Sequence, residues 1–478
     1  MQQSSFFKSF LILFLAAILF VVAKPYLPKK LFPEQQATAN QVVDSTVIEA
    51  ISEAEATDEL NYAEADSMGN QPIVYVDESG IQFPSETAQS YTGNQHLISF
   101  YEKLRLLESN PNQSVRIAYF GDSMTDGDLI VQDLRSAFQS QFGGTGVGFV
   151  PLVSESAGSR SSVKHSFGGS WKDQNFVTSK YSRYAFGING HVFYPTDSLA
   201  WVRYEAGRQA NVASLPNPTL FYGTSRKNGR LKVTYGKDSL WYKLDGNLAL
   251  NTLRIGKSDL KKFRADFIEA DSIPIYGFNF DNGKGVHIDN FSQRGNSGMP
   301  LSKLNPQLLN QFQKKLGYDL IILHYGTNVL NYGTKNYNWY QRGMQKAIAN
   351  LRAGFPGVPI LLISAADKAT KYDMEMRTDS AVVPLTLAQR KLAVETRSGF
   401  INLFELMGGN GSMVRWVDEA PALANKDYTH FNFRGAKKVA SLFYQKLQSG
   451  FITYKRLKSK VATEAVLPEN DSIPDEEM

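Results

Sequence analysis

Three largely apolar runs, residues 115–120, 319–325 and 358–364, each end at or beside a glycine or a serine. Runs of this length, bounded by turn residues, indicate strands that are buried on both faces. Helical patterns are predicted at 96–107, 129–142, 386–396 and 434–447, and a further short strand at 400–404. Strands that alternate with helices in this order predict a parallel sheet with helices packed on both of its faces.

The sequence changes in character between the first and second of these runs. Short alternating segments such as 231–235 and 239–243 are separated by Gly-Lys-Asp and Asp-Gly-Asn turns, a pattern typical of antiparallel strands. We therefore predict an α/β domain in two parts, 90–150 and 286–455, with a β-sandwich inserted at 151–285. Aromatic residues are dense in the insertion; most of them suit a core, and a few exposed rings could stack on sugars.

The two ends of the chain differ from the middle. Lys8 precedes an apolar stretch at 10–23, which has the length of a signal-peptide core and predicts export. Segment 1–24 is predicted to be an uncleaved membrane anchor, with cleavage near Ala23 as the alternative, so that the catalytic domain would lie outside the cytoplasm at the membrane. Recurrent acids predict a flexible tether at 25–89 and a disordered acidic tail at 456–478.

Composition removes several classes of function. The chain has no cysteine, which excludes disulfides, thiolate metal sites and a cysteine nucleophile. The net charge of +5 is small for 478 residues and the basic residues are scattered, which argues against a nucleic-acid partner.

A serine follows the first apolar run, in Gly121-Asp122-Ser123. A serine at the start of the helix that follows a buried strand lies at the carboxyl edge of the sheet, with backbone N–H groups nearby that can stabilise an oxyanion. The sequence therefore makes Ser123 a candidate nucleophile. The plainer alternative is that Asp122 or Ser123 caps the helix.

A calcium loop is a second alternative for the same stretch. Its ligands would be Asp122, Asp126, Asp128 and Asp133, with Gly127 at the turn. Met124 occupies one ligand position and Asp133 replaces the usual bidentate glutamate, so the pattern is a poor match.

The second candidate pair is Asp427 and His430, just before the last predicted helix. Three residues of separation allow the carboxylate to reach the imidazole, orient it and stabilise its protonated form. His430 is one of six histidines in the chain, and among them it alone has an acid at this spacing in such a loop. We predict that His430 acts as a general base and that Asp427 orients it.

Two further segments could stabilise negative charge. Asn328 follows the strand at 319–325 and can donate its side-chain N–H at the same sheet edge. Gly298, or alternatively Gly295, can donate a backbone N–H without a side chain in the way. Ser297 is a rival nucleophile, but Met299 breaks the G-x-S-x-G pattern that a nucleophile elbow would need.

Together these segments resemble the four blocks of the SGNH, or GDSL-like, hydrolases: Gly121-Asp122-Ser123, Gly298, Gly326-Thr327-Asn328 and Asp427-x-x-His430. The resemblance runs from residue 115 to 447. It implies a flavodoxin-like, three-layer α/β/α fold, a triad of Ser123, His430 and Asp427, and an oxyanion hole that includes Gly298 and Asn328. The third block departs from the family, because many members have an acid directly after the asparagine.

The insertion narrows the resemblance to extracytoplasmic peptidoglycan O-acetylesterases, which are similar in having a carbohydrate-binding-like β-sandwich at this place. Residues 142–148 match the stretch that leads into it. What this implies is an esterase that removes acyl groups, specifically acetyl, from a cell-wall or exported glycan without metal or organic cofactor. An O-acetyltransferase with the same triad, or an inactive glycan-binding protein, remain alternatives at this point.

Overall fold

The computed structural model describes residues 14, 44–55, 72–73, 75, 80–225, 228–256, 258–332 and 335–464. The chain divides into a unit of residues 1–42 and a unit of residues 43–478, and the architecture below belongs to the second. The anchor predicted at 1–24 lies outside the described residues, apart from residue 14. Within the described ranges, no helix combines the length and apolar character that a bilayer span requires.

A parallel five-stranded sheet forms the centre of the larger unit. Its strands follow the order β13-β1-β14-β15-β18, and every neighbouring pair is parallel. Their bounds are β1 Ser114–Gly121, β13 Gly285–Asn290, β14 Leu320–His324, β15 Ile360–Ile363 and β18 Gly399–Ile401. This is the flavodoxin-like order, with β1 next to two later strands, so the predicted parallel sheet is confirmed.

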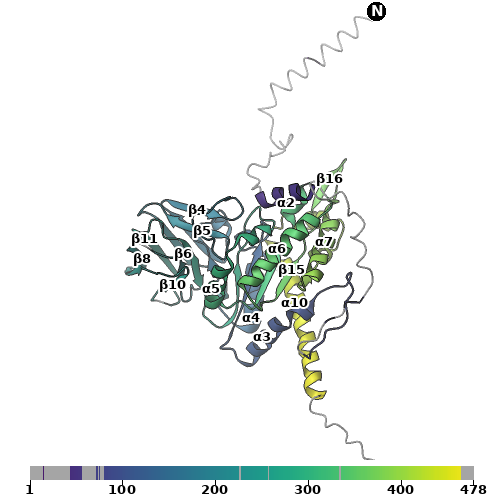
Figure 1. Cartoon of the computed structure of the whole chain (residues 1–478), viewed down its shortest axis with the longest axis horizontal. Helices are drawn as coiled ribbons and strands as arrows, with labels where there is room; N and C mark the ends of the chain where they lie inside the picture. The colour runs from purple at the N-terminus through teal and green to yellow at the C-terminus, as the bar shows by residue number, and fades with distance from the viewer. Residues whose placement is uncertain are drawn as a thin grey trace, which may run out of the picture. The chain divides into compact units, whose positions relative to one another are not determined.

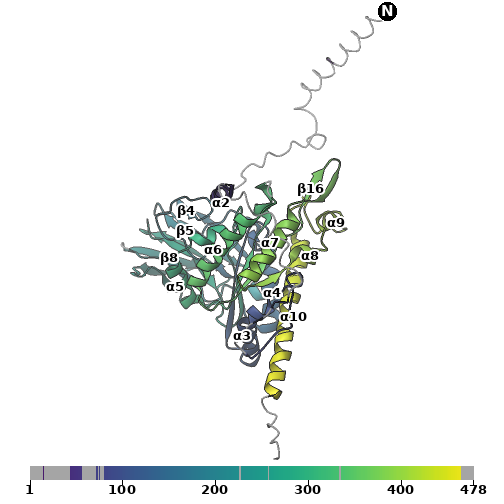
Figure 2. The same cartoon turned by 45° about the vertical axis from the view of Figure 1, so that its right-hand side comes forward.

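Helices cover both faces of this sheet (Figures 1 and 2). On one face lie α3 (Ile98–Ser109), α4 (Val131–Phe142) and α10 (Phe433–Glu464), which share one apolar core with the sheet. The other face carries α5 (Pro306–Leu316), α6 (Asn338–Gly354) and α7 (Val382–Glu395). Smaller elements complete this part: α8 Leu403–Met407, α9 Ser412–Asp418 and the hairpin of β16 Ala369–Tyr372 and β17 Glu375–Thr378.

Two antiparallel sheets are inserted between α4 and β13. The first has the order β10-β7-β12-β5-β4, with β2 also paired to β12; the second has the order β3-β6-β11-β8-β9. The strands of the first are β2 Gly148–Val150, β4 Trp171–Asn175, β5 His191–Pro195, β7 Thr219–Tyr222, β10 Asn251–Arg254 and β12 Ile275–Phe280. Those of the second are β3 Val163–Gly168, β6 Trp201–Ala206, β8 Gly229–Tyr235, β9 Asp238–Leu244 and β11 Lys262–Ile268.

The two sheets enclose an apolar core of their own, as in a β-sandwich. The first sheet also packs outward against the α/β domain, because Phe221 of β7 stacks on Phe312 of α5 with ring centroids 5.8 Å apart. The second sheet lies at the far end of the molecule from the α/β domain (Figure 1).

Polar residues join the insertion to the central sheet. Arg116 of β1 is buried and donates to both oxygens of Asp289 on β13, at 2.7 and 2.9 Å. The same guanidinium binds Asp281 and Asn279 at the end of β12. Tyr318 donates its hydroxyl to Asp289 at 2.6 Å, so the carboxylate is enclosed by donors.

The structure differs from the sequence prediction at both ends of the described region. Within the predicted tether, Ser45–Glu55 forms helix α2, and Ile81 and Phe83 are buried. Within the predicted tail, α10 continues to Glu464 because Phe451 and Tyr454 pack against Tyr101. Within the described residues, segments 45–55 and 456–464 are therefore helical, contrary to the prediction, because these helices contact residues far away in the sequence.

Candidate active site

The candidate residues lie at the carboxyl edge of the parallel sheet. In the strand register, Gly121 at the end of β1 pairs with His324 at the end of β14, and Tyr119 pairs with Asn290 at the end of β13. Ser123, Gly298 and Asn328 all follow these strand ends. Parallel strands end on the same side, so segments that are about 200 residues apart in sequence meet there.

Ser123 lies in a turn, not at the start of a helix as predicted. The turn continues into a 3-10 segment, Asp126–Asp128, and α4 begins only at Val131. Asp122 holds the turn, because its Oδ1 accepts the backbone N–H of Met124 at 2.9 Å. The alternative that Asp122 or Ser123 caps the helix is wrong, because α4 begins at Val131 with Ile130 as its N-cap residue. Ser123 is partly exposed.

His430 and Asp427 lie in the loop that connects α9 to α10. Asp427 Oδ2 is 2.8 Å from His430 Nδ1. Asp427 Oδ1 accepts the backbone N–H groups of Thr429 and His430, both at 3.0 Å. Partial burial raises the pKa of Asp427, but these hydrogen bonds outweigh it and the pKa lies below its usual value.

The structure brings Ser123 and His430 into contact, with Ser123 Oγ 2.9 Å from His430 Nε2. A proton on Nδ1, facing Asp427, leaves Nε2 as an acceptor for the serine hydroxyl. Asp427, His430 and Ser123 therefore form a continuous hydrogen-bonded chain across 307 residues of sequence. This arrangement suits a serine whose hydroxyl is activated by a histidine.

Asp122 adds a buried carboxyl beside this chain. Burial raises the pKa of Asp122 to about 6, although the Met124 N–H, the nearby His430 and the Thr327 N–H each act to lower it. Asp122 is thus a charged group in the protein interior at neutral pH. The sequence alone did not suggest that Asp122 is a buried, charged carboxylate, because an aspartate before a predicted helix is equally typical of a helix cap.

The two predicted oxyanion donors meet at one residue, Asn296. The Gly298 N–H donates to Asn296 Oδ1 at 2.9 Å, and Asn328 Nδ2 donates to the Asn296 carbonyl at 3.1 Å. Gly298 has a φ of +93°, and a Cβ there would lie 2.7 Å from the Tyr325 ring, so only glycine suits this position. Both donors are engaged in this conformation; their role as an oxyanion hole stays a prediction.

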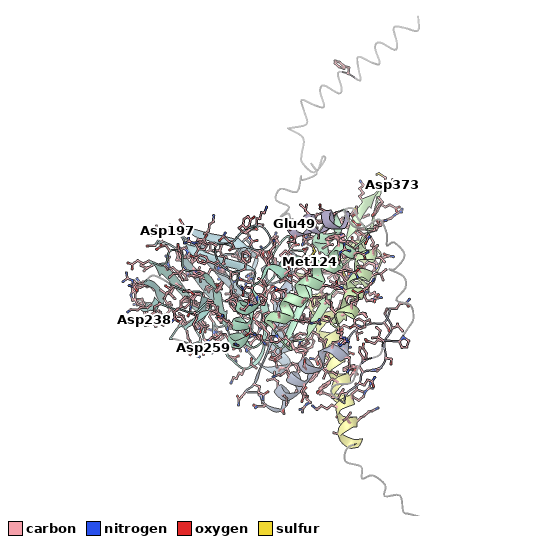
Figure 3. All side chains as sticks on the ribbon, in the orientation of Figure 1. Glu49, Met124, Asp197, Asp238, Asp259 and Asp373 are labelled. Atoms are coloured by element: carbon pink, nitrogen blue, oxygen red, sulfur yellow. The ribbon has the colours of Figure 1, made fainter. Side chains whose placement is uncertain are left out.

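Asp44, from the predicted tether, binds the same loop. It is 1% exposed, and its Oδ2 accepts the Ser297 N–H at 3.1 Å and the Ser297 hydroxyl at 2.5 Å. Ser297 is thus a partner of Asp44, and Met299 N–H in turn donates to Ser297 Oγ at 3.2 Å. Helix α2 contacts α6 and the 3-10 segment Met299–Lys303, and in Figure 3 its Glu49 is labelled at the same end of the α/β domain as Met124, the neighbour of Ser123.

The acids of the alternative calcium loop have other partners. Arg135 holds both oxygens of Asp128, at 2.8 and 3.0 Å, in the interior. Arg294 binds Asp126 at 2.7 Å. Ion pairing therefore accounts for Asp126 and Asp128, and within the described ranges no cluster of three acids or histidines is arranged to hold a metal ion.

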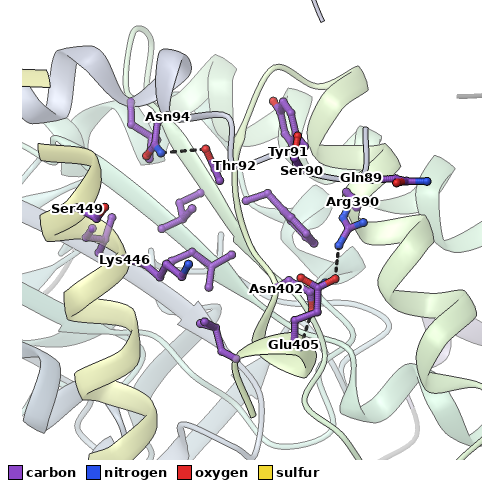
Figure 4. A pocket seen from close by; sticks show the side chains of 16 residues that line it. Gln89, Ser90, Tyr91, Thr92, Asn94, Arg390, Asn402, Glu405, Lys446 and Ser449 are labelled. Atoms are coloured by element: carbon purple, nitrogen blue, oxygen red, sulfur yellow. Dashed lines mark hydrogen bonds and ion pairs between the residues drawn. The ribbon is translucent and has the colours of Figure 1, made fainter. Parts of the chain in front are cut away.

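A cavity of about 260 Å³ lies elsewhere, at the β18 edge of the sheet (Figure 4). Its lining includes Tyr91, Asn94, Lys446 and the ion pair of Arg390 with Glu405, at 2.6 Å. None of the candidate residues lines this cavity, so it is separate from the serine site.

No protein-family model matches the sequence, and no curated protein matches it. A solved structure of a peptidoglycan O-acetylesterase matches with a TM-score of 0.62 and 22% identity, covering 77% of this chain and 98% of that chain. A family two carbohydrate esterase from Cellvibrio japonicus matches with a TM-score of 0.26 and 10% identity, covering 61% of this chain and 99% of that chain.

The first of these likenesses shows the fold. The matched 77% of this chain is more than residues 90–150 and 286–455 and the two chain ends make up, so the match includes part of the insertion. This chain therefore has the architecture of that esterase, as the sequence resemblance predicts. The second likeness has a TM-score too low to add to the argument.

Proposed function

We propose that this chain is an exported serine esterase that removes O-acetyl groups from a cell-wall or exported glycan. The observation that carries the proposal is the chain of two hydrogen bonds from Asp427 through His430 to Ser123, at 2.8 and 2.9 Å. The shared fold with a peptidoglycan O-acetylesterase supports the ester class of substrate. Segment 1–24 would anchor the chain, with the catalytic domain outside the cytoplasm.

In the first half of the proposed reaction, Ser123 Oγ attacks the acetyl carbonyl carbon while His430 Nε2 takes the serine proton. The carbonyl oxygen becomes an oxyanion that accepts from the Ser123 N–H, the Gly298 N–H and Asn328 Nδ2. His430 then gives the proton to the leaving glycan oxygen, the carbon–oxygen bond breaks, and an acetyl-serine remains.

In the second half, water loses a proton to His430 and attacks the acetyl-serine. Acetate leaves, and the proton returns to Ser123 Oγ. Asp427 stabilises the imidazolium in both halves, which suits its lowered pKa, because it stays ionised throughout. In the resting structure the Gly298 N–H donates to Asn296, so the substrate oxygen must take over that hydrogen bond, whereas Asn328 Nδ2 has a second N–H besides the one it donates to Asn296.

The test compares the full-length chain with Ser123→Ala on p-nitrophenyl acetate and on O-acetylated peptidoglycan, with released acetate as the readout. We expect Ser123→Ala to lower kcat by at least about 1,000-fold on both substrates. Ser161→Ala, which changes an exposed serine in the insertion, is the control and should keep the rate. Equal rates for the wild type and Ser123→Ala would refute the proposal. Acetyl transfer to an added oligosaccharide, in place of acetate release, would refute hydrolysis but not the triad.

A further inference from the structure

The second sheet of the insertion, β3-β6-β11-β8-β9, has one face in the sandwich core and one face outward. Alternate residues show this plainly: along β8, Leu231 and Val233 are buried while Arg230 is exposed. The first sheet has core contacts on one side and α5 on the other. The outward face of the second sheet, called the distal face below, is therefore the broad sheet surface of the insertion that faces away from the α/β domain.

The distal face is ordered in rows. Trp201, Asp266, Lys232 and Trp241 are successive cross-strand partners from β6 to β9. In the adjacent row, the successive partners are Arg203, Arg264, Thr234 and Ser239. Because register fixes these neighbours, their side chains form one continuous surface.

Cations dominate this surface. Its basic residues are Lys164, Arg203, Arg230, Lys232, Lys243, Lys262 and Arg264. Its acids are Glu205 and Asp266, which pair with Lys164 at 2.9 Å and Arg264 at 2.7 Å, and Arg230 pairs with Glu269 at the sheet end. In the part of the chain that the structure describes, Arg203, Lys232, Lys243 and Lys262 form no direct ion pair, although Lys262 is the cross-strand partner of Glu205. The distal face thus keeps a net positive charge that its own acids do not neutralise.

An aromatic ring lies among these cations. Trp241 is 53% exposed, a large fraction for an indole side chain. Arg230 and Lys232 lie over its ring, at 5.7 and 5.6 Å from the centroid. A flat apolar ring beside ammonium and guanidinium groups fits a ligand that has both apolar ring faces and negative charges.

We propose that the distal face binds an anionic polysaccharide, with a sugar ring stacked on Trp241 and carboxylates of the chain paired with Lys232, Lys243 and Arg203. The residues of the proposed site run from β6 to β9, which is three strand spacings of about 4.8 Å or about 14 Å, so a ligand that contacts all of them must be extended. A polysaccharide with carboxylates repeated along it meets this requirement. The site is separate from Ser123, and its existence does not depend on the proposed esterase activity.

An anionic membrane and a nucleic acid would meet the same cations, but each fits less well. Membrane insertion needs a group of apolar side chains, whereas the outward neighbours of Trp241 on its own strand are Ser239 and Lys243. Single-stranded nucleic acid binds by stacking on several aromatic rings, whereas of the two rings in these rows Trp241 is 53% exposed and Trp201 is only partly exposed, with Arg264 at 4.3 Å from its centroid. Both serve as comparison ligands in the test.

The test measures binding of the full-length chain to polygalacturonate by isothermal titration calorimetry in 50 mM salt. A neutral glucan of equal length, phosphatidylglycerol vesicles and a DNA oligomer are the comparison ligands. The face variant is Arg203→Gln, Lys232→Gln, Lys243→Gln. The control variant, Lys314→Gln, Lys315→Gln, Lys346→Gln, removes the same charge from exposed positions on α5 and α6. Trp241→Ala tests the stacking contribution separately.

We expect the face variant to lose at least tenfold in affinity for polygalacturonate and the control variant less than twofold. Trp241→Ala should lose about fivefold or more, and this loss should persist in high salt because stacking is weakly screened. Three outcomes would overturn the proposal: no binding of polygalacturonate by the wild type, equal losses in the face and control variants, or tighter binding of vesicles or DNA than of the acidic polysaccharide.

Discussion

Two aspartates beside the serine site have opposite electrostatic environments. Asp427 is half exposed and accepts hydrogen bonds from an imidazole and from backbone N–H groups, which lower its pKa. Asp122 is fully buried, and burial raises its pKa to about 6. The first carboxylate is stabilised by its contacts, whereas the second is charged at neutral pH at a cost to folding.

Asp122 makes stability depend on pH with a definite sign. Its folded pKa of about 6 lies above the ordinary aspartate pKa of 3.8, so between these pH values the folded chain binds more protons than the unfolded chain. The free energy of unfolding therefore falls as pH rises from about 4 to 6, by about 3 kcal/mol from this group. Asp122→Asn removes this titration. The free energy of unfolding of the variant minus that of the wild type should therefore be about 3 kcal/mol larger at pH 8 than at pH 4.

Urea unfolding of both proteins at pH 4 and pH 8 measures this difference, and comparing the two pH values cancels any pH-independent effect of the amide. A stability difference between the proteins that is the same at both pH values would contradict the raised pKa.

Asp427→Asn tests the orienting carboxylate. An amide can donate to His430 Nδ1 and so favour the tautomer with its proton on Nε2, which cannot accept from Ser123. We expect kcat on p-nitrophenyl acetate to fall by about 1,000-fold or more, with KM changed little. Asp418→Asn, an exposed acid on α9, is the control and should leave kcat unchanged. Near-normal turnover by Asp427→Asn would mean that Asp427 does not orient His430.

Helix α2 and Asp44, the residue just before it, contact the loop that carries Gly298. Val47 of α2 is fully buried, and Asp44 just before it accepts two hydrogen bonds from Ser297. Ser297 is the residue before Gly298, so the position of that backbone N–H depends on a carboxylate more than 250 residues away. The segment 44–55 is therefore part of the folded catalytic domain.

Asp44→Ala should lower kcat by about tenfold while KM changes less than twofold. Removing the carboxylate leaves the Ser297 donors unpaired in the interior, at about 1–3 kcal/mol, and frees the loop that positions Gly298. Glu49→Ala, at an exposed position on the same helix, is the control. Steady-state kinetics on p-nitrophenyl acetate gives the comparison. An unchanged kcat, or an equal loss in Glu49→Ala, would show that Asp44 does not position the loop.

The whole molecule consists of an α/β domain and an inserted β-sandwich that share a buried polar junction. Arg116 is buried with Asp281 and Asp289, and these contacts lower the pKa of Asp281 although its burial alone would raise it. Aromatic rings continue the junction from Phe149 through Phe221 to Phe312. The two parts are therefore expected to unfold together.

Arg116→Met should lower the free energy of unfolding by about 3–5 kcal/mol, because it leaves Asp281 and Asp289 in the interior without their cation. Arg377→Met, which breaks the exposed pair of Arg377 with Glu375, should cost less than about 1 kcal/mol. Urea unfolding followed by tryptophan fluorescence measures both changes. A loss below 1 kcal/mol for Arg116→Met would contradict a stabilising junction.

Local pattern was sufficient to predict much of this protein. The apolar runs at 115–120, 319–325 and 358–364 lie in β1, β14 and β15, because a strand buried on both faces must be apolar along its whole length. The order of the parallel strands then required Ser123 and Asn328 to lie at one edge. Asp427 and His430 were predictable as a pair because only three residues separate them.

Contacts between residues that are distant in sequence decided which charged residues are buried and which segments are folded. Strand β13 contains Asp289, which does not suggest a buried strand until Arg116 supplies its counter-charge from β1. Asp44 lies in an acidic stretch typical of a tether, and only the docked loop at Ser297 distinguishes it from its neighbours. A sequence shows which residues are apolar and how they repeat, whereas the burial of a charge depends on a partner that folding brings to it.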